Sequence, residues 1–245
     1  MNRWLFDLGN TRLKCAPLRE DGSVGEVLAL PHRIEDAAAA MDAALPRRFD
    51  VAYLASVASP ELTTTVLDAL TRRCSLISRA RTQPRFGSMT IAYAQPEKLG
   101  VDRFLALVAL HARGGPALSC GIGTALTIDL LAGDGHHLGG RIAPSPALMR
   151  EALHARAAQL PVEGGQYREF AADTEDALAS GCDGAAVALI GRSLAEAARL
   201  LGEPPPLHLH GGGGERLLAA LPEARWSPGL VLEGLARWAL ESSAC

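Results

Sequence analysis

A short apolar strand that runs straight into a glycine-bearing turn is the feature that most constrains this chain. Residues 4–6 (WLF) lead into residues 7–14 (DLGNTRLK), after which the chain continues as a second apolar segment. A turn of the same build, GIGTALTID, occupies residues 121–129. Each turn predicts a β-hairpin, a connection in which glycine and asparagine are common.

Both turns also contain residue types that bind phosphate. Glycine lets backbone N–H groups approach an anion, threonine adds a hydroxyl donor, and aspartate can hold a cation that neutralises the phosphates. We interpret the two turns as halves of a clamp on phosphate groups, with two ordinary hairpin turns as the alternative.

In the first turn, Asp7 ends a strand, where a carboxylate can bind Mg²⁺. Asn10 and Thr11 would donate to phosphate oxygens, and Lys14 could reach a β- or γ-phosphate. In the second turn, the nucleotide would be bound from the opposite side by small and hydroxyl residues, and an acid is again available for the cation. These residues are Gly123, Thr124, Thr127 and Asp129.

The order of predicted elements indicates that the two halves of the chain repeat one plan. A length of 245 residues suits two domains, and a hydrophobic content of 48% allows each to form a core. We expect an α/β fold with an N-terminal domain at 1–115 and a C-terminal domain at 116–245, the last helix packing back on the N-terminal domain. Predicted strands cover 4–6, 13–18, 24–30, 51–57, 117–119, 125–131, 137–142 and 207–209. Predicted helices cover 34–45, 60–73, 102–113, 147–159, 174–201 and 229–241.

Composition excludes several classes of protein. A net charge of −3 and a pI near 6.2 argue against nucleic acid as the main partner. Five scattered cysteines without a C-x-x-C pair are typical of a reducing compartment. No window approaches the roughly 18 apolar residues of a membrane span, and the N-terminus has no leader pattern. We therefore expect a soluble cytoplasmic protein with no membrane partner.

Two further segments are candidates for chemistry. Asp102 lies where a loop enters a helix, so it is either an N-cap or a general base for an attacking hydroxyl, and Arg103 beside it could hold a substrate carboxylate. The glycines at 211–214 follow a strand, and their backbone could lie under an adenosine; a mobile loop is the alternative. The histidine pairs His136-His137 and His208-His210 favour packing or solvent roles over metal binding.

Taken together, these motifs resemble those of the type III pantothenate kinases over almost the whole chain. The resemblance rests on DLGNT at 7–11, Tyr93 with LGVDR at 99–103, GTALTID at 123–129 and GGRIAP at 139–144. Thr174 with Ser180-Gly181, the glycines from 211 and the ending LVLEGL at 230–235 also fit.

The resemblance implies duplicated ribonuclease-H-like domains of the actin-like ATPase superfamily, with mixed sheets flanked by helices. It implies a homodimer that phosphorylates pantothenate with ATP and Mg²⁺, the first step of coenzyme A synthesis, with Asp102 as proton acceptor. It also implies that a monovalent cation, K⁺ or NH₄⁺, takes part. The implied ATP contacts are Asp7, Leu8, Gly9, Asn10, Thr11, Arg12, Leu13, Lys14 and Thr124, and Gly211 and Gly212 are added from the adenosine turn. The implied pantothenate contacts are Tyr93, Gly100, Val101, Asp102, Arg103 and Thr174, the last from across the dimer interface.

This chain departs from the family pattern at three points. Gly121 stands where the family has an Asp that helps bind the monovalent cation. His210-Gly-Gly-Gly213 replaces Thr-Gly-Gly-Asp, and Pro144-Ser145 replaces Pro-Gly. These departures keep two alternatives open: a non-catalytic accessory protein on the same fold, as suggested for relatives called Bvg accessory factors, and a kinase for another small alcohol.

Overall fold

The protein forms two compact units in a computed structural model that describes residues 1–31 and 34–242. The first unit contains residues 1–114 and the chain from 229 onward, and the second contains residues 115–228. The fifth cysteine, Cys245, lies outside the described residues.

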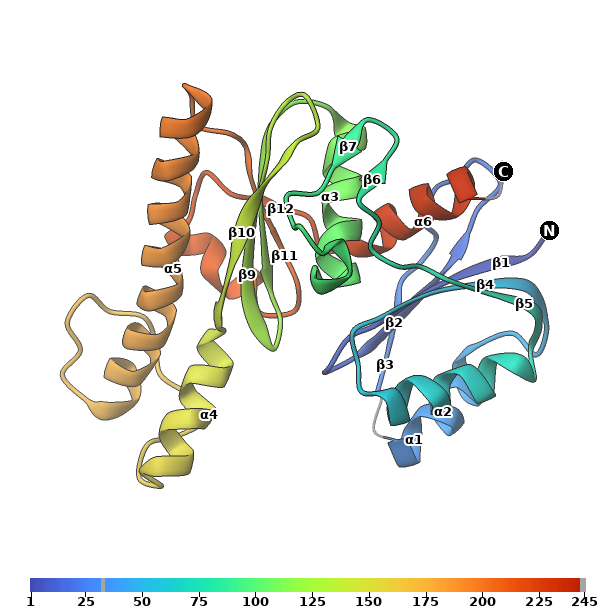
Figure 1. The fold of residues 1–245 in the computed structure, drawn as a ribbon. Helices are drawn as coiled ribbons and strands as arrows, with labels where there is room; N and C mark the ends of the chain where they lie inside the picture. The colour runs from blue at the N-terminus through green and yellow to red at the C-terminus, as the bar shows by residue number, and fades with distance from the viewer. Residues whose placement is uncertain (32–33, 243–245) are drawn as a thin grey trace. The chain divides into compact units, whose positions relative to one another are not determined.

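The first unit is built on a five-stranded mixed sheet (Figure 1). Its strand order is β3-β2-β1-β4-β5, with β1 at Arg3–Leu8, β2 at Leu13–Leu18, β3 at Leu28–Leu30, β4 at Phe49–Ser56 and β5 at Cys74–Arg79. β2 is antiparallel to both of its neighbours, whereas β4 is parallel to both β1 and β5. The register of the β1–β2 hairpin places Asp7 opposite Lys14, so the two side chains share one face of the sheet beside the turn.

Helices cover both faces of this sheet. α1 (Ile34–Ala44) and α2 (Pro60–Thr71) bury Met41, Val66 and Leu70 against one face, where the core also contains Phe6 and Leu54. α3 (Val101–Arg113) and α6 (Leu230–Ser242) pack against each other and against β4. Because neighbouring residues of a strand point to opposite faces, the edge-on contact of Tyr53 with Trp238 places α6 on the second face.

A glycine brings the last helix of the first unit into direct contact with α3. A Cβ on Gly234 would lie 1.9 Å from the carbonyl oxygen of Leu105, so no other residue could stand there without separating the two helices. The remaining elements of this unit are a small hairpin, β6 (Arg85–Phe86) with β7 (Met89–Thr90), and a 3₁₀ turn, η1 (Pro96–Lys98).

The sheet of the second unit has the same strand order and the same directions as the first. Its order is β10-β9-β8-β11-β12, with β8 at Ala117–Ile122, β9 at Ala125–Leu131, β10 at His137–Pro144, β11 at Leu207–His210 and β12 at Arg225–Trp226. β9 is antiparallel to both neighbours, and β11 is parallel to β8 and β12. The expected duplicated α/β fold of ribonuclease-H-like type is therefore confirmed.

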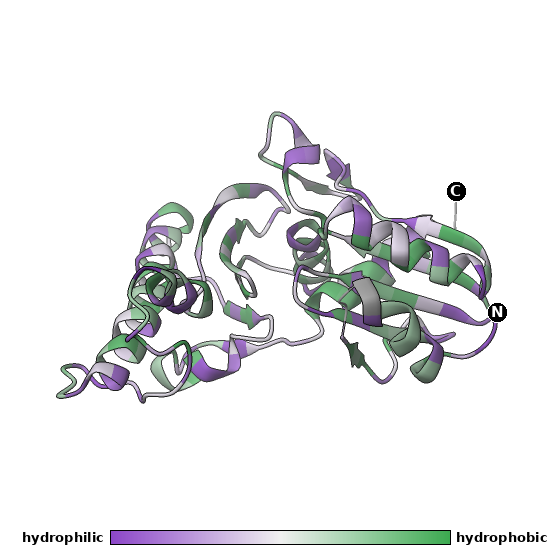
Figure 2. Ribbon diagram, turned by 90° about the horizontal axis from the view of Figure 1, so that it is seen from below, coloured by the Kyte–Doolittle hydropathy of each residue, from purple (hydrophilic) through white to green (hydrophobic). Residues whose placement is uncertain are grey.

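A single long helix covers the apolar face of the second sheet. α5 (Thr174–Leu201) packs Ala186 and Ile190 against the alternate side chains Leu118, Cys120 and Ile122 of β8. Its N-terminus is capped by Asp173, whose carboxylate accepts a hydrogen bond from the backbone N–H of Asp176, and it ends at Gly202 in the left-handed conformation. α4 (Pro146–Arg156) lies beside α5, and a 3₁₀ segment, η2 (Glu215–Ala220), follows β11. In Figure 2 hydrophobic and hydrophilic residues alternate along these helices, as expected where only one side is buried.

Four strands of the structure are absent from the sequence prediction, and one predicted strand is too long. β5, β6, β7 and β12 were not predicted, because each is either two residues long or, in β5, without alternation of buried and exposed residues. The strand expected at 24–30 is shorter, since only 28–30 pair with β2 and Val24 makes a single bridge to Leu18.

Candidate functional site

The turn between β1 and β2 presents backbone and polar atoms while its two leucines are buried. The N–H of Gly9 donates to the carbonyl oxygen of Arg12 at 3.1 Å, which closes the turn. Leu8 and Leu13 are fully buried, so only their backbone atoms could meet a nucleotide, whereas Asn10, Thr11 and Arg12 are exposed.

Asp7 has an electrostatic environment that favours a bound cation. Burial and, second, the nearby Asp102 carboxylate raise the pKa of Asp7 to about 7, and the Lys14 ammonium only partly offsets them. Nearby positive charge offsets the negative charge of this carboxylate only in part. A bound divalent cation, which prefers oxygen ligands, would therefore stabilise the ionised form. The residues present in the first unit therefore fit Mg²⁺ at Asp7.

The start of α3 holds Asp102 against a glycine. Gly100 is the N-cap of α3, and its carbonyl oxygen accepts from the N–H of Phe104 at 3.0 Å. Asp102 is thus the second residue of the helix and not its N-cap, so the capping alternative is wrong. A Cβ on Gly100 would lie 2.6 Å from Oδ1 of Asp102, which means that this carboxylate occupies space that only glycine leaves open. Val101, between them, is half-buried.

Arg103 is a buried cation paired with an aromatic side chain. Its side chain is buried, with 5% of the residue exposed, and Nη1 donates to the hydroxyl of Tyr93 at 3.2 Å. The guanidinium carbon also lies 5.8 Å from the centroid of the Tyr93 ring. The structure thus brings together two residues that the sequence places ten positions apart, and both contacts restrict the orientation of the guanidinium.

The hairpin turn of the second unit is held by its own backbone and by α4. The N–H of Gly123 donates to the carbonyl oxygen of Ala125 at 3.0 Å, and Thr124 is exposed. The carbonyl oxygen of Thr124 accepts from Oγ of Ser145 at 2.9 Å, while the same Oγ accepts from the N–H of Leu148. Ser145, one of the departures from the family pattern, therefore caps α4 and fixes the turn.

The glycines after β11 lie on this hairpin. Gly211 has φ +87°, and a Cβ there would lie 2.4 Å from the carbonyl oxygen of Ile122. The N–H of Gly213 donates to that same oxygen at 3.0 Å. The segment is consequently packed and not loose, and Gly212, where an added Cβ would meet no heavy atom within 4 Å, faces open space.

The polar face of the second sheet contains Asp129, whose partner is a histidine. Nε2 of His137 lies 3.0 Å from Oδ1 of Asp129, and both residues are buried. His136 is exposed, so the expectation that the adjacent pair points to opposite faces is confirmed. Within the described ranges, no three His, Cys, Asp or Glu residues cluster as metal ligands would. Asp129 as a metal ligand stays a prediction.

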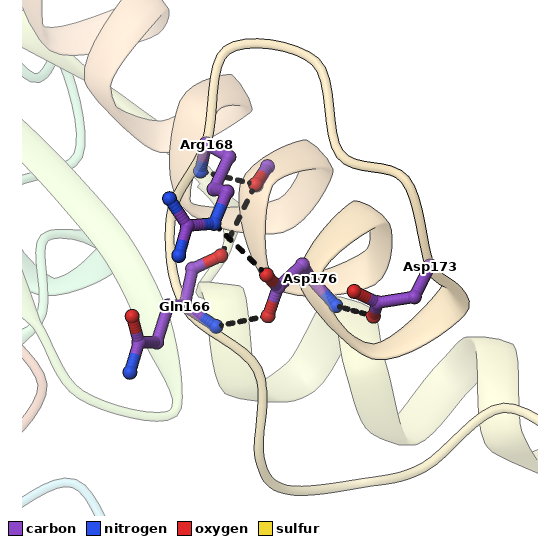
Figure 3. Close-up of polar contacts among 5 residues, drawn as sticks. Gln166, Arg168, Asp173 and Asp176 are labelled. Carbon is purple, nitrogen blue, oxygen red and sulfur yellow. Dashed lines mark hydrogen bonds and ion pairs between the residues drawn. The ribbon is translucent and has the colours of Figure 1, made fainter.

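Thr174, the remaining predicted contact, is the first residue of α5 and is exposed. Figure 3 shows how the preceding loop is fastened to this helix: Asp176 accepts from the N–H of Gln166 at 2.8 Å and from Nε of Arg168 at 3.1 Å. The N–H of Arg168 also donates to Oγ of Ser180 at 2.7 Å. The bonds from Gln166, first, and from the Arg168 side chain lower the pKa of Asp176, and all three bonds keep the loop against the helix end that carries Thr174.

Sequence patterns did not reveal two features of these turns. The space that Gly100 leaves for Asp102 depends on a rotamer, which no motif encodes. The imidazole of His210 lies directly over Gly121, because β11 and β8 pair in a register that sets these residues side by side. His210 and Gly121 are both departures from the family pattern, and only the pairing of β11 with β8 relates them.

Comparison with known proteins relates this chain to one family of enzymes. Residues 4–196 match the family described as type III pantothenate kinase. A type III pantothenate kinase of Stenotrophomonas maltophilia (strain K279a) is 56% identical over 244 residues, which cover all of both chains. One of Xylella fastidiosa (strain M23) is 57% identical over 98% of each chain.

Solved structures at lower identity show the same fold. A Campylobacter jejuni protein described as a Baf family transcriptional activator has a TM-score of 0.65 at 20% identity, covering 99% of this chain and all of the other. A 2-dehydro-3-deoxygalactonokinase protein from Sinorhizobium meliloti has a TM-score of 0.56 at 16% identity, covering 96% and 97%. The family match and the full-length relatives go further than the fold: this chain belongs to the type III pantothenate kinase family.

Proposed function

We propose that this protein transfers the γ-phosphoryl group of ATP to the hydroxyl of pantothenate, the first step of coenzyme A synthesis, with Asp102 as the general base. The observation that carries the role of Asp102 is its position: the carboxylate is held in the space left by Gly100, close enough to Asp7 to raise the pKa of that residue. Phosphoryl transfer requires mainly positioning and neutralisation of charge, together with a group that accepts the proton of the attacking hydroxyl.

The first hairpin would hold the triphosphate. Mg²⁺ bound at Asp7 would neutralise charge on the phosphates, and the expected nucleotide contacts come from the exposed turn residues Asn10, Thr11 and Arg12. Lys14, opposite Asp7 in the hairpin, adds a positive charge on the same face. The remaining expected nucleotide contacts are Thr124 and the backbone at Gly212.

Pantothenate carries a carboxylate, and Arg103 is the residue suited to bind it. Its guanidinium is oriented by Tyr93, so little conformational entropy is lost when a carboxylate binds in two-pronged fashion. We assign the remaining pantothenate contacts to Gly100, Val101 and Thr174.

A homodimer is supported by apolar side chains that the second unit leaves exposed. Phe170 is 99% exposed, only four residues before Thr174, and Ile142 on the edge strand β10 is 66% exposed. Contiguous exposed apolar side chains mark interaction surfaces, and we propose that Phe170 and Ile142 belong to such a surface. We propose that a second copy of the chain covers them and that Thr174 serves the partner's substrate. The variant Phe170→Ser should shift the protein toward monomer in light scattering; an unchanged dimer would exclude Phe170 from the contact.

A cytoplasmic location is supported by the thiols. Cys15, Cys74, Cys120 and Cys182 are unbridged, as in proteins of reducing compartments. In the described part of the chain no helix is both long and apolar enough to cross a membrane.

The decisive experiment is an assay of ADP release by purified protein with Mg-ATP, with and without pantothenate, and mass spectrometry of the product. We expect pantothenate-dependent ADP and a phosphorylated product, and the matched variant Asp102→Asn should lose about 10²–10⁴ in rate. That variant also controls for a contaminating kinase. Turnover with other small alcohols but not pantothenate would favour the alternative substrate, and no turnover would favour a non-catalytic accessory protein.

A further inference from the structure

The second hairpin of this chain has a histidine where a side chain of residue 121 would otherwise lie. β11 and β8 are parallel neighbours in which His210 pairs with Gly121, and Gly121 in turn pairs with Thr127 across the hairpin. A Cβ added to Gly121 would lie 2.8 Å from Cε1 and 2.9 Å from Nε2 of His210, and 2.8 Å from Oγ1 of Thr127. Real Cβ atoms essentially never lie within 3.0 Å of such neighbours, so with a side chain at 121 the imidazole and the Thr127 hydroxyl could not keep these positions.

The backbone that carries this imidazole is held in place. Immediately after His210, Gly211 packs on the carbonyl oxygen of Ile122 in a conformation, φ +87°, that residues with a side chain rarely adopt. The N–H of Gly213 donates to the same oxygen at 3.0 Å, and Oγ of Ser119 lies 3.4 Å from Nε2 of His210. A side chain at 121 would therefore have to displace the ring itself, since the strand cannot retreat without losing these contacts.

The groups at this place do not fit the monovalent cation that the family implies. Hard cations such as K⁺ are bound by carboxylate, carbonyl and water oxygens, whereas imidazole suits softer transition metals. Residue 121 supplies no carboxylate, and its carbonyl oxygen already lies 3.5 Å from the hydroxyl of Thr127. The imidazole lies where the first carbon of a side chain at 121 would be.

We propose that His210 replaces the carboxylate and its bound cation in this turn, so that nucleotide binding by this chain does not depend on K⁺ or NH₄⁺. A glycine at 121 supplies no carboxylate to hold a cation, and the imidazole of His210 fills the volume that a side chain there would take. The inference rests on the proposed function, because it concerns the nucleotide site of that reaction.

The first experiment measures packing alone. Gly121→Ala should lower the melting temperature of the protein in the wild-type background and cost less in the background of His210→Thr, since the smaller residue vacates the space. Gly123→Ala is the matched control, because a Cβ there meets no heavy atom within 4 Å. Equal costs of Gly121→Ala in both backgrounds would show that the ring does not lie over residue 121 and would overturn the proposal.

The second experiment measures affinity for Mg-ATP by calorimetry in K⁺, NH₄⁺, Na⁺ and tetramethylammonium salts at equal ionic strength. The wild-type Kd should agree among these salts within about twofold, a difference well below 1.4 kcal/mol. The double variant Gly121→Asp with His210→Thr restores the family's residues at these two positions, and it should bind at least about tenfold more tightly in K⁺ than in tetramethylammonium. His210→Thr alone, which lacks both groups, should bind more weakly in every salt.

The outcomes separate this inference from the function on which it rests. Tight binding by the wild type in K⁺ only would overturn the role of His210 and leave the kinase assignment intact. Absence of nucleotide binding in every salt would overturn both. A double variant without any preference for K⁺ would show that residue 121 is not where the cation binds, and it too would contradict the proposal.

Discussion

Replacing Asp7 by asparagine should stabilise the metal-free protein while abolishing its affinity for Mg-ATP. The pKa of Asp7 rises from 3.8 to about 7 on folding, chiefly through burial and secondarily through repulsion by Asp102. The folded state therefore holds this proton more tightly than the unfolded chain does. The protonated carboxyl of Asp7 therefore contributes to the free energy of unfolding. This contribution is fully present below about pH 4 and is lost as the pH rises to about 7.

The magnitude follows from the size of the shift. About three pKa units at 1.36 kcal/mol each give about 4 kcal/mol as an upper value. Since the surface of Asp7 is only half-buried, solvent screening reduces this value, and we expect roughly 2–4 kcal/mol. Asparagine resembles the protonated acid in shape and carries no charge, so Asp7→Asn should remove this cost at about pH 8 and change little at about pH 4.

Urea unfolding in the presence of a chelator, at both pH values, measures the difference. Asp68→Asn is the matched control, because it makes the same charge change at a position on α2 away from this carboxylate pair and should show no such dependence on pH. Calorimetry with Mg-ATP then tests binding of the same two variants. A variant at position 7 that is equally stable or less stable than wild type at high pH would refute the electrostatic argument, whatever its activity.

Three further outcomes are expected. Gly100→Ala should lower kcat by at least about tenfold with little change in the melting temperature, because its Cβ displaces the Asp102 carboxylate; an unchanged kcat in steady-state assays would contradict this. Arg103→Lys should raise the KM for pantothenate about tenfold or more while the KM for ATP changes little, since an ammonium loses both the contact with Tyr93 and the two-pronged geometry; parallel changes in both constants would point to a general defect. Asp173→Ala removes the N-cap of α5 and should cost about 1 kcal/mol in chemical denaturation, with Asp173→Asn close to wild type; equal losses in both would show that the cap is not responsible.

The parts of the fold that local rules control could be predicted from the sequence. The β1–β2 hairpin and α5 begin and end within one or two residues of their predicted bounds, because a turn motif or a capping residue marks each end. β5 could not be predicted in the same way. Its residues Cys74–Arg79 show no alternation of burial, and the strand exists because β4 supplies its hydrogen-bonding partner.

In the candidate site, too, residues at local motifs could be predicted and contacts between distant segments could not. Asp7, Lys14 and Asp102 could be proposed from the sequence because each stands at a turn or a helix start, where chemistry is commonly placed. The relation between Gly121 and His210 could not, since the two are 89 positions apart and meet only through the register of parallel strands. The partner and the register of a parallel strand depend on how the whole sheet assembles. They cannot be predicted from the sequence of each segment by itself.

The packing of α6 on α3 has a consequence for biosynthesis. The helix that completes the first unit follows the whole second unit in the sequence, and Gly234 lets it lie directly on Leu105. During synthesis the intervening unit is a continuous segment and can close while it emerges, whereas the first unit must wait, with the second face of its sheet only partly covered by α3, until the residues from 229 onward have been made. In this chain the part that is made first is the part that finishes folding last, and it is the part that contains Asp7 and Asp102.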